Sequence, residues 1–240
     1  MRKDVSCQDA HEEYKKGYDY IQKKDFDSAV KYFESAANKG HIDAQYFLGE
    51  IYSNGWGGYD DCRKGLDYYL KAANQGHKGA QSEAAKLYLI YEEYKNCMDW
   101  GLKAAQAGIA EAQWIIGFLY QRGLGISKNT DKAIYWYEKS AYQNFNQAYL
   151  GLGYVYETDK GDFDKALYWY KMGAQNGFDE CIMGLAIMYQ QTNKNYDAVY
   201  WFNKVIKESN DNELRDEASR RLFQLTGKYS DGFKSWLPGV

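Results

Sequence analysis

The whole chain of 240 residues contains one proline, Pro238, close to its C-terminal end. Proline breaks helices when it lies inside them, so its absence from the rest of the sequence favours uninterrupted helices. Long apolar runs are also missing, and no stretch approaches the roughly 20 apolar residues of a membrane-spanning helix. No apolar core follows the positive charges of residues 1–7, as it would in a signal peptide. We therefore expect a cytoplasmic protein without a membrane span, or a periplasmic or secreted one if a signal peptide has been removed.

Neither sign of charge dominates the sequence. Lys and Arg together number 30 and Asp and Glu 33, which gives a formal net charge of -3. Basic and acidic residues are interspersed rather than gathered in blocks. Because a nucleic-acid-binding surface needs a basic patch or stripe, this pattern argues against a nucleic acid as the partner.

Cysteines are few, four in all. Cys97 and Cys181 occupy positions that hold small residues in the other repeats described below, Cys62 precedes an expected helix, and Cys7 lies among the leading residues. A free cysteine often serves as a small buried apolar residue. We therefore expect free thiols rather than disulfides, which agrees with a reducing compartment.

The sequence does contain an internal repeat of two alternating lengths. A small or polar residue followed by an apolar or aromatic one recurs at spacings of 36, 32, 36 and 33 residues. Periods of this size are typical of stacked helix pairs. Such solenoids bind along an extended surface, which favours partner recognition as the function. The recurring pairs are Gly40-His41, Gly76-His77, Gly108-Ile109, Asn144-Phe145 and Gly177-Phe178.

Each repeat also carries small and apolar residues at helical spacing. In the helix before each turn, the first residue of the expected buried stripe is small. The helix after each turn carries an apolar residue, then a small residue, then a tyrosine three positions later, as in Leu48, Gly49 and Tyr52. Steps of three and four residues indicate one buried stripe per helix. The small residues before the turns are Ala29, Gly65, Cys97, Ala133, Ala166 and Ala198.

These residues resemble the Sel1-like repeat, a relative of the tetratricopeptide repeat, over roughly residues 11–210. The fourth unit resembles it most: Ile116-Gly117, Tyr120, Gly123-Leu124-Gly125, Asp131-Lys132-Ala133, Trp136-Tyr137 and Ser140-Ala141 follow the family's order. The second unit also keeps a glycine loop, at 54–58, whereas the first, third, fifth and sixth units lack one and are more similar to tetratricopeptide units. The two glycine loops account for the two longest spacings, since glycine tolerates the positive φ that tight connections require.

The resemblance implies an all-α fold, a right-handed α-solenoid of about six helix pairs plus a C-terminal capping helix. We expect an N-terminal tail at 1–10, the solenoid at 11–210, the capping helix at 211–226 and a C-terminal tail at 227–240. The last of these contains Phe233, Trp236, Leu237 and Pro238. Two interpretations of it stay open, packing on the capping helix or docking on a neighbouring molecule.

Nothing in the sequence forms a convincing catalytic set, metal site or cofactor site. His41 and His77 are in register, but Ile109, Phe145 and Phe178 fill the same position in other units, so we interpret it as a packing position. His11 is isolated in the sequence. We therefore expect no metal, no cofactor and no enzymatic activity.

The sequence matches one catalytic motif, but only in the spacing of a serine and a lysine. Ser28-Ala29-Val30-Lys31 matches the serine-lysine spacing of penicillin-interacting enzymes, an activity suggested for Cys-rich relatives of the family. The other motifs of that mechanism are absent. Ser28 and Lys31 flank a buried alanine and are expected to be solvated, so we interpret the match as chance.

The related tetratricopeptide geometry implies that the first helix of each pair lines a concave face. Aromatic residues are frequent on this face. Two interpretations stay open: the rings pack the inner side of a tightly curved superhelix, or they form a groove for an apolar segment of a partner. The candidate partner-binding residues are Tyr14, Tyr18, Tyr46, Glu50, Lys86, Trp114, Phe118, Gln121, Tyr154, Glu157 and Ile187.

The expected function is non-catalytic protein binding, by an adaptor or scaffold that holds a peptide or helix of its partner. Three alternatives stay open: an immunity protein that occludes a bacterial toxin or effector, a β-lactamase-like hydrolase, and end-to-end self-assembly. The sequence leaves the oligomeric state undetermined.

Overall fold

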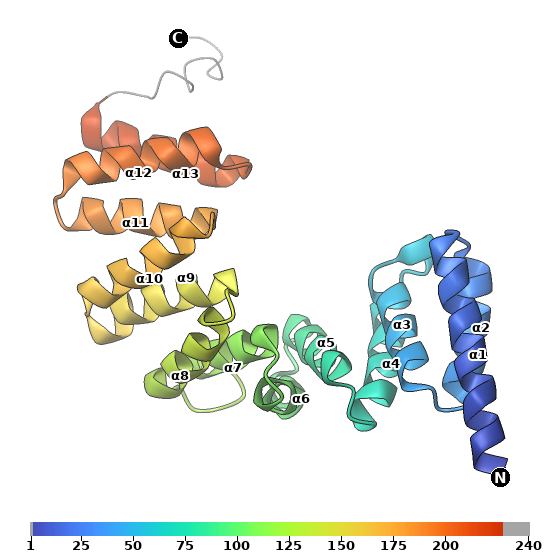
Figure 1. The fold of residues 1–240 in the computed structure, drawn as a ribbon. Coiled ribbons are helices and arrows are strands. Elements are labelled where there is room, and N and C mark those ends of the chain that lie inside the picture. The colour runs from blue at the N-terminus through green and yellow to red at the C-terminus, as the bar shows by residue number, and fades with distance from the viewer. Residues whose placement is uncertain (1, 228–240) are drawn as a thin grey trace. The chain divides into compact units, whose positions relative to one another are not determined.

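The computed structural model describes the backbone of residues 2–227 and the side chains of residues 8–227. Over this range the chain is all helical, without a strand, so the predicted all-α class is confirmed (Figure 1). The helices follow one another through short turns. They are α1 (Arg2–Gln22), α2 (Phe26–Asn38), α3 (Ile42–Ser53), η1 (Trp56–Gly58), α4 (Cys62–Asn74), α5 (Lys78–Ile90), α6 (Tyr94–Gln106), α7 (Ala110–Arg122), α8 (Thr130–Ala141), α9 (Asn146–Val155), η2 (Tyr156–Lys160), α10 (Phe163–Gln175), α11 (Asp179–Gln191), α12 (Asn195–Glu208) and α13 (Asn212–Thr226).

The chain divides into two compact units. Unit 1 comprises Met1–Lys128 and contains α1 to α7, and unit 2 comprises Asn129–Val240 and contains α8 to α13. Within each unit, helices adjacent in sequence pack against each other, and α13 packs on α12 and α11. The single solenoid expected over 11–210 stays a prediction.

The N-terminal end differs from the expected tail. Helix α1 begins at Arg2, so residues 2–10 extend the first helix. No proline or glycine interrupts this stretch, and Ala10 is buried. At the other end α13 begins after the N-cap Asp211. The predictions for Phe233, Trp236, Leu237 and Pro238 concern residues outside the described range.

The recurring small residue between the helices of adjacent repeats has a conformational cause. Gly40 adopts φ +89°, and the residue after it, His41, donates its backbone N–H to the carbonyl of Ala36 at 3.1 Å. This arrangement ends α2 with a left-handed residue that satisfies the last carbonyls of the helix. Asn144, at φ +61°, takes the same place after α8, because asparagine tolerates this conformation better than most residues.

Helix starts are also encoded locally. Asp61 accepts the backbone N–H of Lys64 at 2.9 Å at the start of α4, and Asp162 accepts that of Lys165 at 3.1 Å at the start of α10. Each carboxylate satisfies one of the free N–H groups of the first helical turn. The acidic residue before each of these helices therefore determines where it begins.

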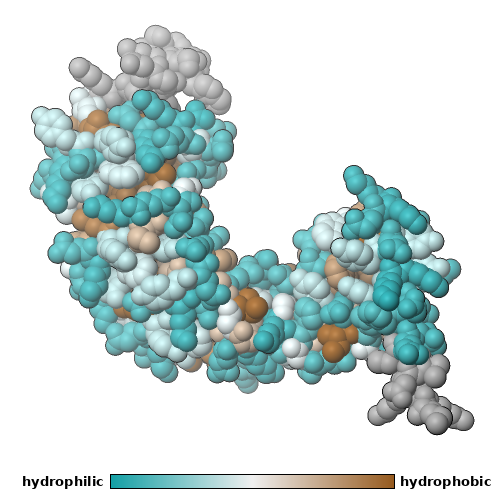
Figure 2. Space-filling model, viewed as in Figure 1, coloured by the Kyte–Doolittle hydropathy of each residue, from teal (hydrophilic) through white to brown (hydrophobic). Residues whose placement is uncertain are grey.

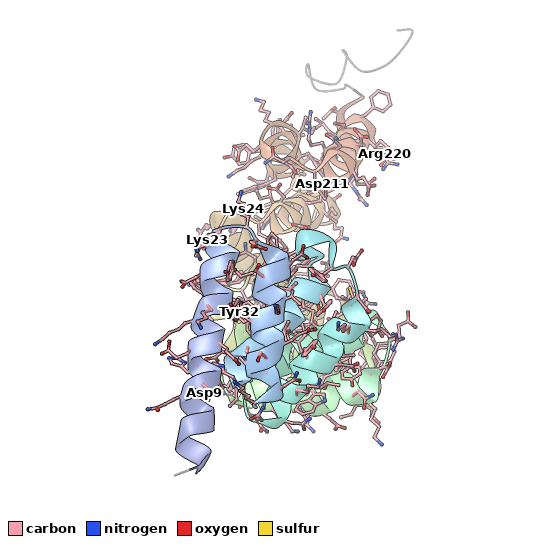
Figure 3. All side chains as sticks on the ribbon, turned by 90° about the vertical axis from the view of Figure 1, so that its right-hand side faces the viewer. Asp9, Lys23, Lys24, Tyr32, Asp211 and Arg220 are labelled. Atoms are coloured by element: carbon pink, nitrogen blue, oxygen red, sulfur yellow. The ribbon has the colours of Figure 1, made fainter. Side chains whose placement is uncertain are left out.

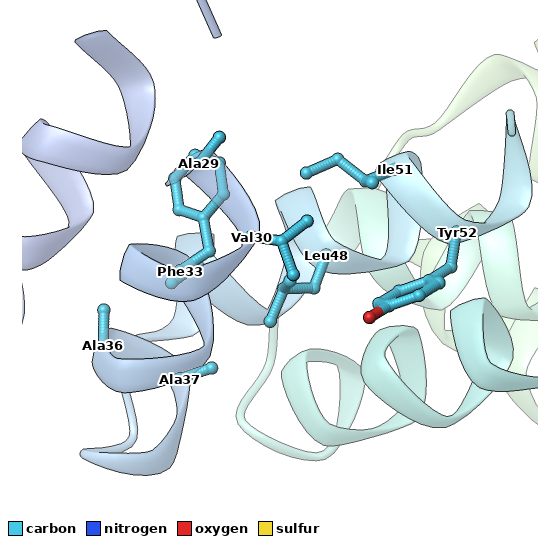
Figure 4. Packing of buried hydrophobic residues seen from close by; sticks show 9 residues of the cluster. Ala29, Val30, Phe33, Ala36, Ala37, Leu48, Ile51 and Tyr52 are labelled. Atoms are coloured by element: carbon cyan, nitrogen blue, oxygen red, sulfur yellow. The ribbon is translucent and has the colours of Figure 1, made fainter. Parts of the chain in front are cut away.

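The core lies between consecutive helices. In the first such cluster Phe33 and Leu48 are fully buried and alanines such as Ala29 and Ala36 lie beside them, as Figure 4 shows. The small residues that open each stripe, from Ala29 to Ala198, are all buried. Their small size lets neighbouring helices approach closely, as the sequence pattern predicted.

The two glycine loops contact the preceding repeat. A Cβ added to Gly57 would lie 2.5 Å from Cβ of Phe26, the first residue of α2. A Cβ added to Gly125 would lie 2.8 Å from Cβ of Tyr94, the first residue of α6. In the two longer repeats, the extra residues therefore cover the first residue of the second helix in the preceding repeat. Only glycine fits at these contacts.

Candidate partner-binding faces

The residues predicted to bind a partner lie on first helices in both units. In unit 1 they come from α1, α3, α5 and α7, and α5 contacts both α3 and α7. We call this surface the first-helix face of unit 1. It contains Tyr14, Tyr18, Tyr46, Glu50, Lys86, Trp114, Phe118 and Gln121.

Two tyrosines of this face stack on histidines from the next turn. The ring of Tyr14 lies 4.5 Å from that of His41, with 15° between the planes, and Tyr46 lies 4.5 Å from His77, with 28° between the planes. Both tyrosines are half-buried. Because Phe47 also contacts both rings, at 6.0 Å from each, the tyrosines are held in fixed positions.

The histidines do more than the packing predicted from sequence. His41 Nδ1 accepts the backbone N–H of Ala44 at 3.3 Å, and His77 Nδ1 accepts that of Ala80 at 2.9 Å. Each ring therefore caps the helix that follows it. Burial lowers the pKa of both histidines, against an opposing effect of Asp43.

His11 is not isolated, contrary to the sequence interpretation. Its Nδ1 lies 3.2 Å from His41 Nε2, and the two rings stack with centroids 5.5 Å apart. The sequence separation of 30 residues hid this contact, which the packing of α1 beside the next turn creates. Among the described residues no group of three or more His, Cys, Asp and Glu side chains could hold a metal ion.

A carboxylate cluster lies beside the tyrosines. Glu50 accepts a hydrogen bond from the Tyr69 hydroxyl at 2.6 Å, and Lys86 Nζ lies 3.4 Å from both Glu83 and Glu111. Burial raises the pKa of Glu83, and the nearby carboxylates add to this effect. Burial acts to lower the pKa of Lys86, but the two glutamates outweigh it and the pKa is raised.

Tyr18 on α1 is 42% exposed, and its ring lies 5.9 Å from that of Phe47. The other predicted residues of unit 1 come from α7. The rings of Trp114 and Phe118 stack with centroids 5.9 Å apart, and the guanidinium of Arg122 lies 5.9 Å from the Phe118 ring. Both rings are half-buried, whereas Gln121 is only 7% exposed and offers a partner little surface. The rings of α7 therefore pack on one another and still reach the surface.

Unit 2 has its own first-helix face, built by α9 with the π-helix η2 that follows it and by α11, which contacts α9. Tyr154 on α9 is 42% exposed, and Ile187 on α11 is half-buried. Glu157 accepts a hydrogen bond from the Tyr170 hydroxyl at 2.9 Å. Tyr69, at the equivalent position in unit 1, donates in the same way to Glu50, although Glu50 and Glu157 are not at equivalent positions of their repeats.

Ser28 and Lys31 have ordinary helical surroundings. Ser28 lies in the first turn of α2, where its backbone N–H donates to Asp25 at 3.0 Å, and Lys31 is exposed. Ser28 therefore belongs to the capped start of a helix. Nothing in this geometry activates its hydroxyl as a nucleophile.

The described thiols are free. Cys97 and Cys181 are buried and Cys62 is half-buried, so the expectation of unpaired cysteines is confirmed for these three. Burial raises the pKa of Cys97 to about 12. No helix in the described range is long and apolar enough to cross a membrane, and Figure 2 shows hydrophobic residues in separate patches on a largely hydrophilic surface.

Sequence reasoning missed a set of exposed aromatic residues on second helices of unit 2. Tyr135, Tyr168 and Tyr200 are 51%, 54% and 61% exposed. The available signal was the Tyr-Trp dipeptide that begins at each of these positions. Apolar periodicity marks the buried stripe of a helix and says nothing about an aromatic residue that lies outside it.

Comparison with known proteins places these features in a family. The family description "Sel1 repeat" matches residues 9–41, 42–77, 110–145 and 146–178. The solved structure of a Sel1 repeat protein from Oxalobacter formigenes superimposes with a TM-score of 0.75 at 26% identity, over 93% of this chain and 94% of that one.

Two curated fungal proteins share part of the sequence. Chitin synthase regulator SKT5 of Saccharomyces cerevisiae is 31% identical over 135 residues, which is 53% of this chain and 19% of that protein. Chitin synthase regulatory factor 3 of Schizosaccharomyces pombe is 31% identical over 123 residues, 48% of this chain and 13% of that protein. The chain thus matches less than a fifth of the length of either relative.

Proposed function

Since the chain belongs to the Sel1 repeat family, we propose that it is a non-catalytic adaptor that binds a peptide or helix of a protein partner along its first-helix faces. Repeat folds of this kind act as protein-interaction scaffolds, because stacked units present one extended surface. The curated relatives are named as regulators of an enzyme, which agrees with an adaptor role.

The observation that carries this proposal is the packing of the aromatic rings. Tyr46 is held between His77 and Phe47, and Trp114 is stacked on Phe118, yet all these rings remain half-buried rather than enclosed. A ring that is already fixed loses little side-chain entropy on binding. Tryptophan and tyrosine are also the residues that most often dominate binding energy.

Affinity purification of the double variant Trp114→Ala, Tyr154→Ala from the native cell tests this role. A matched control replaces two aromatic residues outside the first-helix faces, Trp56 in η1 and Tyr142 after α8, which are 36% and 74% exposed. We expect the first variant to lose the partner and the control to retain it. Circular dichroism should give the same helix content for both.

Equal partner recovery by both variants would contradict the first-helix faces as the binding surface. The partner recovered with the unchanged protein would also identify its class, because an adaptor should retrieve an enzyme or assembly component. A toxin in its place would assign the immunity role instead.

A further inference from the structure

The carboxylate cluster on the first-helix face of unit 1, formed by Glu50, Glu83 and Glu111, has more negative than positive charge. Lys86 Nζ lies 3.4 Å from both Glu83 and Glu111, so one ammonium group serves two acids. Glu50 accepts a hydrogen bond from the Tyr69 hydroxyl but forms no ion pair within the described range. Three carboxylates against one ammonium therefore leave an excess of negative charge when all these groups are ionised.

The remaining charged residues of α3, α5 and α7 do not balance this excess at the cluster. Asp43, at the start of α3, adds another exposed carboxylate. Lys78 is exposed in the first turn of α5, eight residues before Lys86, which is about 12 Å along a helix. Arg122 is exposed in the last turn of α7, eleven residues after Glu111, which is about 16 Å along a helix. Both cations thus lie towards the ends of their helices.

The cluster also differs from ordinary surface charges in its burial. Asp9 on α1 and Lys23 and Lys24 just after it are exposed on the surface, as Figure 3 shows. The side chains of Glu83 and Glu111 are only 24% and 30% exposed. Because charges in a half-buried site are screened less by water and salt, an opposite charge of a partner is attracted more strongly here than at a fully exposed residue.

A buried hydroxyl on the same side of α5 lacks a partner. Ser82 is 2% exposed, and its Oγ accepts or donates no hydrogen bond among the described residues. It lies one helical turn before Lys86 and therefore on the same face of the helix. An unpaired buried hydroxyl costs free energy. A lysine or arginine side chain that joins Lys86 at the cluster would supply the missing N–H donor.

Aromatic rings flank the cluster on the two neighbouring first helices. The position that Ser82 takes in α5 holds Tyr46 in α3 and Trp114 in α7. Both rings are half-buried. Burial raises the pKa of the Tyr46 hydroxyl, and the three carboxylates of the cluster add to this effect, so Tyr46 lies close to them. Aromatic rings pack against the apolar stem of a lysine or arginine and attract its cationic head.

We propose that the carboxylate cluster binds a lysine or arginine side chain of the partner segment, and that the rings of Tyr46 and Trp114 hold apolar side chains beside it. The segment recognised by unit 1 is therefore a basic residue with apolar neighbours. An acidic segment would bring like charges together, which weakens binding. This inference rests on the proposed adaptor function and deepens it, because it states the chemistry of the partner.

Selection of random short peptides, displayed on phage, against the full-length protein tests the proposal. We expect the enriched peptides to carry a lysine or arginine beside leucine, phenylalanine or another apolar residue. The cluster variant Glu50→Gln, Glu83→Gln, Glu111→Gln should lose the preference for the basic residue. It should still select apolar residues, because the rings of the first-helix face are unchanged.

A matched variant controls for net charge. Asp60, Asp67 and Asp99 are exposed residues of unit 1 that lie outside the first helices. Their combined replacement by asparagine removes as many carboxylates as the cluster variant does. We expect this control to select the same basic peptides as the unchanged protein, because the lost charges are not at the cluster.

Fluorescence anisotropy with the most enriched basic peptide gives the size of the effect. We expect the cluster variant to bind it about tenfold or more weakly, because a half-buried charge pair is lost. A peptide with glutamine in place of the basic residue should bind the unchanged protein just as weakly. The cluster variant should not distinguish the two peptides, since the interacting pair is already broken. The variant Glu83→Gln, Glu111→Gln keeps Glu50 as the acceptor for Tyr69 and serves if the triple variant does not fold.

The proposal and the adaptor function fail in different ways. Selection of acidic or neutral peptides, no selection at all, or a basic peptide that binds the cluster variant undiminished would overturn the proposal. The adaptor function is measured separately, by recovery of a partner from the native cell with the unchanged protein. A partner recovered equally well by the cluster variant would leave the adaptor function in place and reject the cluster as its contact.

Discussion

The imidazole of His77 lies flat against the phenol ring of Tyr46, with 4.5 Å between the ring centroids. The same histidine accepts the backbone N–H of Ala80 and so caps α5. One side chain thereby links the start of a helix to a ring of the first-helix face. The stability of the turn and the position of that ring are therefore coupled.

The cap predicts the effect of replacing His77. We expect His77→Ala to lower the free energy of unfolding by about 0.5–2 kcal/mol, the usual cost of losing an N-cap. His77→Asn should recover most of this loss, because asparagine caps helices well although it cannot stack on Tyr46. Urea denaturation followed by circular dichroism measures both, and equal losses in the two variants would show that the stack matters more than the cap.

The histidine caps also predict a dependence of stability on pH. The folded-state pKa values of His41 and His77 are lowered by burial from the ordinary value of 6.5. The unfolded chain therefore binds protons more readily, and the unfolding free energy decreases as the pH falls through 6.5 towards the folded-state values. Protonation of Nδ1 would also remove the cap.

Urea midpoints at a series of pH values measure this effect. The double variant His41→Asn, His77→Asn is the control, since asparagine caps without titrating. Its stability should change less between neutral and mildly acidic pH than that of the unchanged protein. Parallel profiles for the two proteins would mean that other groups cause the pH dependence.

A third prediction concerns the close contact between Gly49 and Tyr69. A Cβ at Gly49 would collide with the ring of Tyr69, which is 1% exposed and cannot move aside freely. We expect Gly49→Ala to cost about 1–3 kcal/mol by overpacking. Gly79→Ala in α5 is the comparison, because a Cβ at Gly79 would lie 3.2 Å from Cε1 of His77, a much looser contact than that of Gly49 with Tyr69. A thermal unfolding midpoint lowered by the first change alone would agree with this prediction.

The cysteines predict a pattern of thiol reactivity. Because the thiolate is the reactive form, burial that raises the pKa of Cys97 to about 12 should make this thiol inert in the folded protein. The pKa of Cys181 is raised in the same way. In a Cys7→Ser background, a thiol reagent should modify Cys62 first and the two buried cysteines only in denaturant. Rapid modification of all three thiols in the native protein would contradict their burial.

Local sequence signals predicted much of the fold because each acts within a few residues. The positive φ at Gly40 needs glycine or asparagine, and the carboxylate of Asp61 reaches a backbone N–H only three residues ahead. The buried stripe around Leu48 and Gly49 repeats at helical spacing. Helices, turns and the small-residue contacts between them could therefore be predicted without knowledge of long-range contacts.

The candidate site was predictable only as a set of positions. The repeat register assigned Tyr46 and Trp114 to first helices. It could not predict which ring stacks on each of them. His11 looked isolated, because its contact with His41 depends on how α1 packs beside the next turn. Gln121 looked available to a partner, yet it is buried.

The amino-acid sequence by itself determined the all-helical class, the repeat lengths and the positions of the turns, since caps, glycines and apolar periodicity act locally. Tertiary packing decided which side chains remain accessible and which become caps or buried partners, because exposure is a property of neighbours distant in sequence. Tyr168 and Tyr170 illustrate the difference: two residues apart on α10, one is 54% exposed and the other 3%. Their surroundings, rather than their chemistry, make one available to a partner and the other part of the core.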